Sequence, residues 1–510
     1  MSDKTYFLYR MQGARLFMDI NSTSQPTFKR PEDENLGLAA NVAYGFQHVL
    51  TMYGGIIAVP LIVGQAAGLG PAEIGLLIAA SLFIGGMATI LQTIGIPFFG
   101  CQLPLVQGVS FASVATIVAI VTAGGGLPSV FGAVIAASAL GLLITPIFSK
   151  IIKFFPPLVT GAVITTIGLT LMPVAARWAM GGNSKAPDFG SMTNVGLAAF
   201  TLALVLLLSK LGNAAISRLS ILLAMVIGTL FAWAIGLVDF SNVMTGPIFA
   251  FPTPFHFGAP TFELAAIISM FIVVLVILVE TSADILAVGD IIETDIDSKR
   301  LGNGLRADMV SSIVAPMFGS FTQSAFAQNV GLVAVTNVKS RFVVAAAGVI
   351  LVVLGLMPLM GRVIATVPTA VLGGAGIVLF GTVAASGIRT LAQVSYTNNM
   401  NLIIVATSIG FGMLPIAAPA FYDQFPDWFA TIFHSGISST AIMAILLNLL
   451  FNHLKVGNSE NQSVFAAGTE PRSVRQDVIL DLTDGDYFSE GKLFDVDNNE
   501  VPIAPKQSAH

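Results

Sequence analysis

Residues 264–284 read LAAIISMFIVVLVILVETSAD, a long apolar run that ends in a cluster of polar side chains. A helix needs about 20 mostly apolar residues to cross a bilayer, so we predict a membrane-spanning helix over 262–284. Glu280 and Asp284 lie near its end. A charged side chain at membrane depth costs roughly 2.5–3.5 kcal/mol on insertion scales. Carboxylates in such a place therefore indicate a site that holds a polar solute or a proton.

The composition extends this interpretation to the whole 510-residue chain. Hydrophobic residues make up 55% and charged residues only 10%, and the mean hydropathy is +0.84. A soluble domain carries about 25% charged residues, so the lipid bilayer must cover much of this surface. The single cysteine, Cys101, excludes an internal disulfide and a cysteine-built metal site. We find no basic patch, phosphate loop or nucleophile–base pair, and we expect no nucleic-acid partner, no cofactor and no enzymatic activity.

Apolar stretches of membrane-spanning length recur along the chain and predict an all-α polytopic membrane protein. Three stretches, 102–123, 302–319 and 322–338, contain polar residues or proline and are less regular. With these three included, fourteen segments are predicted. They span 37–62, 73–96, 102–123, 128–149, 157–176, 193–210, 217–237, 262–284, 302–319, 322–338, 341–360, 368–388, 399–416 and 429–451.

The distribution of basic residues predicts the orientation. The odd-numbered connections hold only Arg177, Lys185 and Arg362. The even-numbered connections hold Lys150, Lys153, Lys210, Arg218, Lys299, Arg300, Arg306, Lys339, Arg341 and Arg389. Lys and Arg accumulate on the cytoplasmic side, so we expect both termini in the cytoplasm. Residues 1–36 and 452–510 are then cytoplasmic tails around a transmembrane part at 37–451, and the polar tail from Lys455 should have little fixed structure.

Two similar interruptions suggest an internal repeat. Phe99-Gly100 precedes the irregular stretch with Ser110-Phe111-Ala112, and Phe318-Gly319 precedes the stretch with Gln328-Asn329. Halves of seven segments each would be inverted relative to one another, because seven is odd. Matched interrupted segments in two halves are a pointer to a binding site near the membrane midplane.

Three carboxylates are candidates for this site. Glu280 and Asp284 are four residues apart and share one helix face. Either could instead be solvated at the end of its helix, an alternative that stays fully open for Asp284. A buried carboxylate can accept hydrogen bonds when ionised and carry a proton when neutral. Asp308 lies in an apolar segment, where it could cap backbone groups or relay protons.

Amides, an aromatic ring and a histidine complete the candidates. Gln328 and Asn329 can donate and accept hydrogen bonds, and Gly331 would allow close backbone approach; an ordinary polar loop is the alternative. Phe111 could stack on a flat heterocycle or simply pack. His48, within the first segment, could tune the site or be a satisfied core residue.

Residues 328–336, QNVGLVAVT, carry a resemblance to a known family. The run is similar to the signature of the nucleobase–ascorbate transporters (nucleobase:cation symporter-2), which include bacterial xanthine and urate permeases. Asn337 departs from the usual next residue of the signature. Gln47-His48 resembles the family's Gln-His pair. Glu280–Asp284 resembles its Glu-x-x-Gly-Asp motif, with Ala283 in place of glycine.

The resemblance implies a fold. Members of the family have fourteen segments in two inverted repeats of seven, with short strands in the broken segments three and ten. Segments 1–4 and 8–11 form a core domain, and segments 5–7 and 12–14 form a gate domain. By this similarity the protein would reside in the cytoplasmic (inner) membrane, as a homodimer.

The resemblance also implies a function: import of a purine base, xanthine or uric acid, by proton symport. The implied substrate-binding residues are Glu280, Gln328, Phe111, Asn329, Ser110 and Ala327. Asp308, His48 and Asp284 would serve proton coupling or the network around the site, and Gly331 and Thr336 belong to the signature. Uracil-type members have Glu where Gln328 stands, so a uracil–proton symporter is the alternative. A sulfate-type anion transporter is a second alternative, against which the membrane-buried Glu280 argues.

Overall fold

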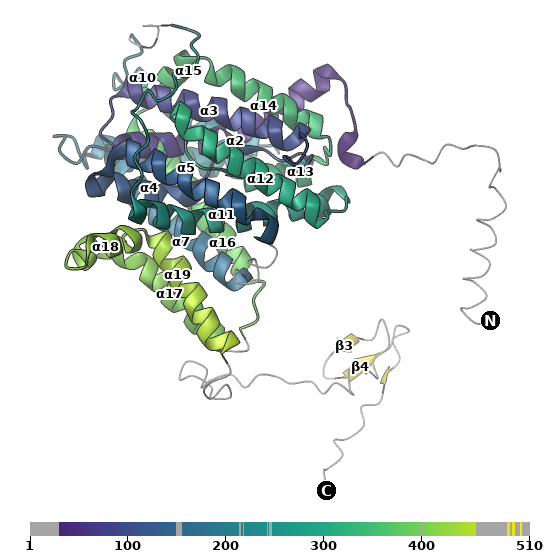
Figure 1. The fold of residues 1–510 in the computed structure, drawn as a ribbon. Coiled ribbons are helices and arrows are strands. Elements are labelled where there is room, and N and C mark those ends of the chain that lie inside the picture. Colours follow the sequence, from purple (N-terminus) through teal and green to yellow (C-terminus); the bar gives the residue numbers. More distant parts are fainter. Residues whose placement is uncertain are drawn as a thin grey trace. The chain divides into compact units, whose positions relative to one another are not determined.

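The structure, a computed structural model, describes residues 30–148, 156–213, 216–217, 219–241, 243, 247–396, 399–454, 487–489, 492–494 and 500–501. Most of both predicted tails, and the loop charges Lys150, Lys153 and Arg218, lie outside the described residues. The main unit comprises residues 1–394 and 403–454. Figure 1 shows that its described part is built of helices packed side by side.

Helices follow one another along both halves of the main unit. The first half contains α2 (Leu38–Ala66), α3 (Pro71–Ile94), α4 (Val114–Ile120), α5 (Gly126–Ile144), α7 (Pro157–Ala179), α8 (Met192–Leu211) and α10 (Ser220–Ala234). The second half contains α11 (Leu264–Ile292), α12 (Ser298–Val314), α13 (Ala327–Thr336), α14 (Arg341–Gly355), α15 (Pro358–Ala365), α16 (Thr369–Leu391), α17 (Asn399–Ala417), α18 (Asp427–Phe433) and α19 (Gly436–Asn448). Proline at the first position starts α3, α7 and α15, where its missing N–H costs nothing.

The lengths of these helices suit a membrane protein. Among the described residues, nine helical stretches are long and apolar enough to cross a bilayer. A tenth is obtained when α14 and α15, which meet at a bend of 78°, count as one span. Other predicted segments contain shorter helices, such as the 15-residue α10 and the 10-residue α13. The protein is thus mostly helical and crosses the membrane many times, with several spans interrupted.

Close helix pairs determine how the main unit packs. α16 lies along α7, and α14 lies along α3 and α2, while α5 packs against α11 and α12. Glycines permit the closest approaches. A Cβ atom on Gly168 would lie 2.3 Å from the Ala384 nitrogen, and one on Gly387 would lie 2.2 Å from the Thr165 nitrogen. Small residues at helix contacts are typical of membrane proteins, because association there depends on close packing.

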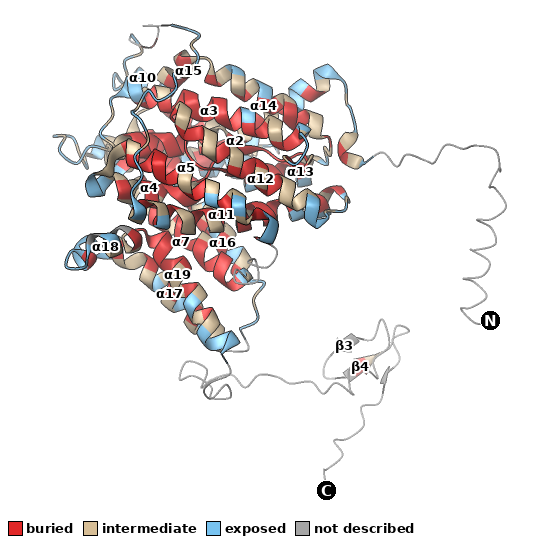
Figure 2. Cartoon of the chain, in the orientation of Figure 1, coloured by how far each residue is buried: buried red, intermediate tan, exposed pale blue. Residues whose placement is uncertain are grey.

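Burial is concentrated where these helices meet, as Figure 2 shows in red. Large apolar side chains on other faces stay exposed, including Leu206 and Leu207 on α8 and Leu230 and Trp233 on α10. An exposed apolar surface of this extent would be costly in water, and it fits a chain whose outer surface contacts lipid.

A second unit consists of residues 395–402 and 455–510. Its described residues include β3 (Tyr487–Ser489), β4 (Lys492–Phe494) and β5 (Glu500–Val501), which form an antiparallel sheet in the order β3-β4-β5. The prediction of little fixed structure in the tail is wrong for these three strands. The tail's low apolar content concealed these short strands, in which Phe488 pairs with Leu493 and Leu493 pairs with Val501.

Candidate functional site

Two short strands from distant parts of the chain meet inside the main unit. β1 (Gln107–Val109) pairs antiparallel with β2 (Gln323–Ala325), with Gly108 opposite Ser324. Pro104 precedes β1, and proline disfavours a helix interior because it lacks an N–H donor, which helps to keep this stretch extended. Bonds from Ser110 N to Thr322 O and from Phe326 N to Val106 O, 2.9 and 3.0 Å long, extend the ladder at both ends.

Side-chain hydroxyls satisfy the outer edges of this strand pair. The Gln107 N–H donates to Thr89 Oγ1 at 2.9 Å, and the Gln323 N–H donates to Ser312 Oγ at 2.8 Å. The Ala325 N–H donates to Thr281 Oγ1 at 3.3 Å. Non-helical backbone is tolerated at membrane depth only where its polar groups are paired. These hydroxyls therefore allow two strands to exist among helices.

Each strand runs into a helix that starts beside a cavity. β1 leads through a turn of 3-10 helix (Phe111–Ser113) into α4, and β2 leads into α13. The cavity has a volume of about 360 Å³. It is lined by Val109, Phe111, Ala112, Ile164, Ile167, Glu280, Ser324, Ala325, Phe326, Ala327, Gln328, Thr382, Val383, Ala385, Ser386 and Arg389. Strands, broken segments, α7, α11 and α16 thus all contribute to one pocket.

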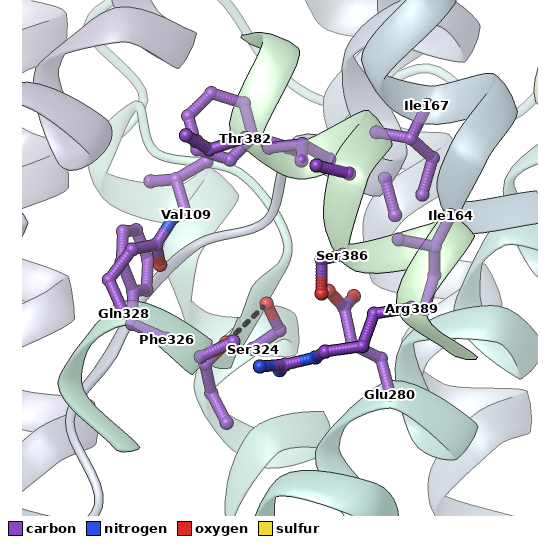
Figure 3. Close-up of a pocket in the computed structure, with 16 residues that line it drawn as sticks. Val109, Ile164, Ile167, Glu280, Ser324, Phe326, Gln328, Thr382, Ser386 and Arg389 are labelled. Atoms are coloured by element: carbon purple, nitrogen blue, oxygen red, sulfur yellow. Dashed lines mark hydrogen bonds between the residues drawn. The ribbon is translucent and has the colours of Figure 1, made fainter. Parts of the chain in front are cut away.

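Four of the predicted substrate-binding residues line this pocket: Phe111, Glu280, Ala327 and Gln328. Figure 3 shows Gln328 and Glu280 reaching the cavity from different elements. Glu280 lies inside α11, which continues to Ile292, eight residues beyond the predicted end of this segment at 284. It is half-buried, so the alternative of a fully solvated carboxylate does not hold. The Phe111 ring packs edge-on against Phe380, with 6.2 Å between ring centroids.

Behind the pocket, Asp308 and Asp284 are buried, with exposed fractions of 1% and 9%. The Thr281 hydroxyl donates to Asp308 Oδ2 at 2.6 Å. The other Asp308 oxygen, and Oδ2 of Asp284, have no hydrogen-bond partner among the described residues. Leaving such groups unpaired in a low-dielectric interior is costly. Because it is buried, Asp284 is an interior residue, and the alternative of a solvated position at the helix end is wrong.

Asn329 and His48 link the signature to the first segment, a pairing that the sequence did not predict. The Asn329 amide donates to His48 Nδ1 at 3.0 Å and to the His48 carbonyl oxygen at 3.2 Å. Both side chains are buried, and neither lines the cavity. Asn329 therefore ties α13 to α2 and holds the start of α13, where Gln328 projects into the pocket.

Three residues named from the sequence do not line the cavity: Ser110, Gly331 and Thr336. Ser110 is buried and caps the turn after β1, since its Oγ accepts from Ala112 N at 3.2 Å. The interpretation of Gly331 as a point of close backbone approach is wrong: a Cβ atom there would meet nothing within 4 Å. α13 turns this position outward. Thr336 donates to the Leu332 carbonyl oxygen at 2.8 Å in the last turn of α13.

The sequence analysis missed the contribution of α7 and α16. Arg389 was counted as a loop charge, yet it lies in the last turn of α16 and lines the cavity together with Ser386 and Thr382. Figure 3 shows Arg389, Ser386 and Glu280 at the same end of the pocket. Within the described residues, neither Glu280 nor Arg389 belongs to an ion pair. A basic residue near a helix end looks like an interfacial charge in the sequence, so the pattern held no signal for this role.

Comparison with solved structures establishes the general fold. The transmembrane domain of the cyanobacterial bicarbonate transporter BicA superposes with a TM-score of 0.54 and 17% sequence identity. The match covers 81% of this chain and 98% of that domain. At this identity the likeness concerns the fold alone.

Sequence comparison is closer. The uric acid transporter UacT of Escherichia coli is 40% identical over 429 residues, which are 83% of this chain and 89% of that protein. The xanthine permease of Bacillus subtilis is 39% identical over 416 residues, covering 82% and 94%. The Permease family (Xan_ur_permease) matches residues 39–421. The family resemblance found in the motifs is thus confirmed, and the chain belongs to the Permease family of multi-pass membrane transporters.

Proposed function

We propose that this permease imports a purine base, xanthine or uric acid, by proton symport. The observation that carries the proposal is the meeting of Glu280 and Gln328, from two helices, at one cavity beside the Phe111 ring. A Gln amide can pair with one donor and one acceptor on the edge of a purine, and an aromatic ring can stack on its face. The names of UacT and of the Bacillus xanthine permease support this substrate class.

Glu280 is the proposed meeting point of substrate and proton. It is the carboxylate of the cavity lining, and it can hold the substrate when ionised and carry a proton when neutral. Asp308 and Asp284 lie buried behind it with unpaired oxygens, a placement typical of proton pathways in membrane proteins. We assign them, with His48, to the supporting network.

The fourteen-segment inverted repeat is part of the same proposal. Equivalent backbone groups in the two strands have equivalent partners: Gln107 N bonds Thr89 of α3, and Gln323 N bonds Ser312 of α12. The helix pairs that join the halves also correspond, since α3 of the first half packs with α14 of the second, and α12 of the second packs with α5 of the first. A two-fold relation between the halves explains both correspondences.

The division into core and gate domains is supported by the packing. α2, α3, α5, α11, α12 and α14 pack with one another, and α7, α8, α10, α16 and α19 form a second group. The proposed substrate site then lies between the groups, because core residues such as Gln328 face gate residues such as Ser386 across the cavity.

A second cavity of about 660 Å³ supports the proposal of alternating access. It is lined by α4, by α7 beyond the first cavity and by the start of α11, and it includes Glu263 and His434. Between the groups, Thr116 Oγ1 lies 2.7 Å from Ser435 Oγ, and Ser269 Oγ lies 3.3 Å from Ser438 Oγ. We propose that these hydroxyl contacts part when the gate moves, so that the substrate site opens to the other side.

We place the protein in the cytoplasmic (inner) membrane with both termini in the cytoplasm, following the distribution of basic residues. We also propose a homodimer. In the most apolar 18-residue stretch of each helix, only 22% of the residues of α8 and 28% of those of α17 are buried. Both helices therefore have faces free for lipid or for a second copy.

The deciding experiment is uptake of radiolabelled xanthine into proteoliposomes, with and without an inward proton gradient. Gradient-dependent uptake that unlabelled uric acid blocks supports the proposal. Uptake of uracil without xanthine would favour the uracil–proton symporter. The positive charge of Arg389 at the cavity favours an anion transporter as the second candidate, and sulfate transport without xanthine uptake would establish that alternative.

A further inference from the structure

A short acidic segment before the first long helix is packed into the main unit. Glu32, in the 3-10 turn Pro31–Asp33, has an exposed fraction of 0% and forms an ion pair with Arg300, which stands in the first turn of α12. The Thr294 hydroxyl donates to the same carboxylate oxygen at 3.4 Å. Breaking a buried ion pair by removing one partner is strongly destabilising, so this contact fixes both chain segments.

Arg300 also donates hydrogen bonds to the backbone that leads to the site. Its Nε donates to the Cys101 carbonyl oxygen at 2.7 Å, and its Nη2 donates to the Gln102 carbonyl oxygen at 2.9 Å. Gln102 has a φ of +56°, in the left-handed region that non-glycine residues rarely adopt. Such a conformation persists only where surrounding contacts hold it. Five residues after Gln102, β1 begins.

The neighbouring carboxylate makes a parallel arrangement. Asp33 Oδ1 lies 2.7 Å from Arg341 Nε. Arg341 Nη1 donates to the carbonyl oxygens of Thr93 and Ile94, at 3.0 and 2.9 Å. These are final carbonyls of α3, which have no partner within the helix. The two acidic residues thus each anchor an arginine, and the two arginines hold the connection between α3 and β1 at its start and at 101–102.

We propose that Glu32 and Asp33 form an acidic clasp, which fixes Arg300 and Arg341 as positioning residues for β1 and the Phe111 turn. The clasp touches neither the cavity nor the proposed substrate. It acts through backbone: a connection held at 93–94 and at 101–102 delivers β1 in register with β2, and Phe111 follows two residues after β1. Without the clasp, the strained connection should open first, because it depends on side chains from outside.

The single cysteine, Cys101, lies where Arg300 holds the connection. The reactivity of its thiol therefore measures whether the connection is closed or open. Cys101 has an exposed fraction of 0%. It lies in the connection outside the membrane-spanning helices, and burial raises the pKa of its thiol to about 12, with the Arg300 charge opposing this rise. The thiolate is the nucleophile in alkylation, so at pH 8 the closed connection should react very slowly with a maleimide. Opening returns the pKa towards the ordinary value of about 8.5 and exposes the sulfur.

The test is the rate of N-ethylmaleimide labelling of Cys101 in the full-length protein in native membranes, measured by mass spectrometry. We expect Glu32→Gln, which removes the charge and keeps the shape, to raise the rate at least tenfold. Arg300→Lys should raise it as well, because lysine keeps the charge but has no planar fork to hold Glu32 and two carbonyl groups together. The matched control is Glu293→Gln, which removes the ion pair with Lys339 from an 84% exposed side chain and should leave the rate unchanged.

A second measurement, of uptake, distinguishes a loss of positioning from general unfolding of the protein. Glu32→Gln should raise the substrate concentration at half-maximal uptake several-fold while the protein still elutes as a single peak in size-exclusion chromatography. Labelling of Glu32→Gln at the wild-type rate would overturn the clasp and leave the segment as a mere anchor for the tail. If Glu32→Gln does not fold, Asp33→Asn, whose carboxylate is 36% exposed, provides the same labelling test. Labelling does not depend on the substrate, so it decides the clasp even if xanthine is not transported.

Discussion

At the scale of single residues, the proposed mechanism depends most on Glu280, which is proposed to bind both the substrate and the proton. Glu280→Gln keeps the size of the side chain and one accepting oxygen, but the amide cannot release or take up a proton. We therefore expect gradient-driven uptake to fall by at least tenfold, with expression and membrane insertion unchanged. Uptake assays in proteoliposomes, with the protein quantified by immunoblot, provide the measurement. Wild-type uptake driven by the proton gradient in this variant would remove Glu280 from the mechanism.

Gln328 determines the chemistry presented to the substrate. Gln328→Glu replaces a group that donates and accepts with one that, when ionised, only accepts. We expect affinity for xanthine to weaken by about 1–3 kcal/mol, the cost of leaving a buried polar group unpaired, and competition by uracil to strengthen. Competition curves for xanthine uptake test this. Unchanged selectivity would show that Gln328 does not contact the substrate.

The residues also show how far the sequence leads. Glu280 and Gln328 interrupt apolar runs, and this made them visible without coordinates. The bond between Asn329 and His48 joins positions 281 residues apart, and no local pattern encodes such a partnership. Arg389 and Ser386 escaped detection because polar residues near a helix end are ordinary. Gly331 was misassigned because a glycine's use depends on what faces it, and α13 turns it outward.

At the scale of elements, the contact between α7 and α16 depends on glycine. Gly387→Ala would place a methyl group 2.2 Å from the Thr165 nitrogen, whereas Gly381→Ala on the same helix would meet only Met172 Cε, at 3.6 Å. We expect the first change to destabilise the protein by about 1–3 kcal/mol, as overpacking does, and the second to be neutral. Thermal denaturation of the detergent-solubilised variants distinguishes them. Equal melting temperatures would show that the two helices can separate at little cost.

The broken elements were only partly predictable. Polar residues and Pro104 revealed that the third and tenth segments are irregular. The sequence alone did not reveal their strand register, because register depends on hydroxyl groups of Thr89, Ser312 and Thr281 that come from three other helices. Similarly, the bend of 78° between α14 and α15 lies in a stretch that hydropathy describes as one span.

At the scale of the whole molecule, the proposed dimer can be tested by mass. We expect light scattering on the detergent-solubilised protein to give a protein mass of twice the 53.2 kDa chain. The apolar faces of α8 and α17, which are little buried in a single chain, would then be protected in part from lipid. A protein mass of one chain, at concentrations where uptake activity persists on reconstitution, would contradict the dimer.

The pairing of β1 with β2 has a consequence for biogenesis. Ser113 and Thr322, whose hydroxyls meet at 2.8 Å beside the strands, are 209 residues apart. A ribosome therefore delivers the first broken segment to the membrane long before its partner strand has been synthesised. Until then the N–H and C=O groups of β1 lack their hydrogen-bond partners in β2, and the hydrocarbon of the bilayer offers no hydrogen bonds in their place. The insertion machinery must hold this segment in a hydrated or shielded place, and the nascent first half becomes a natural substrate for membrane chaperones and proteases.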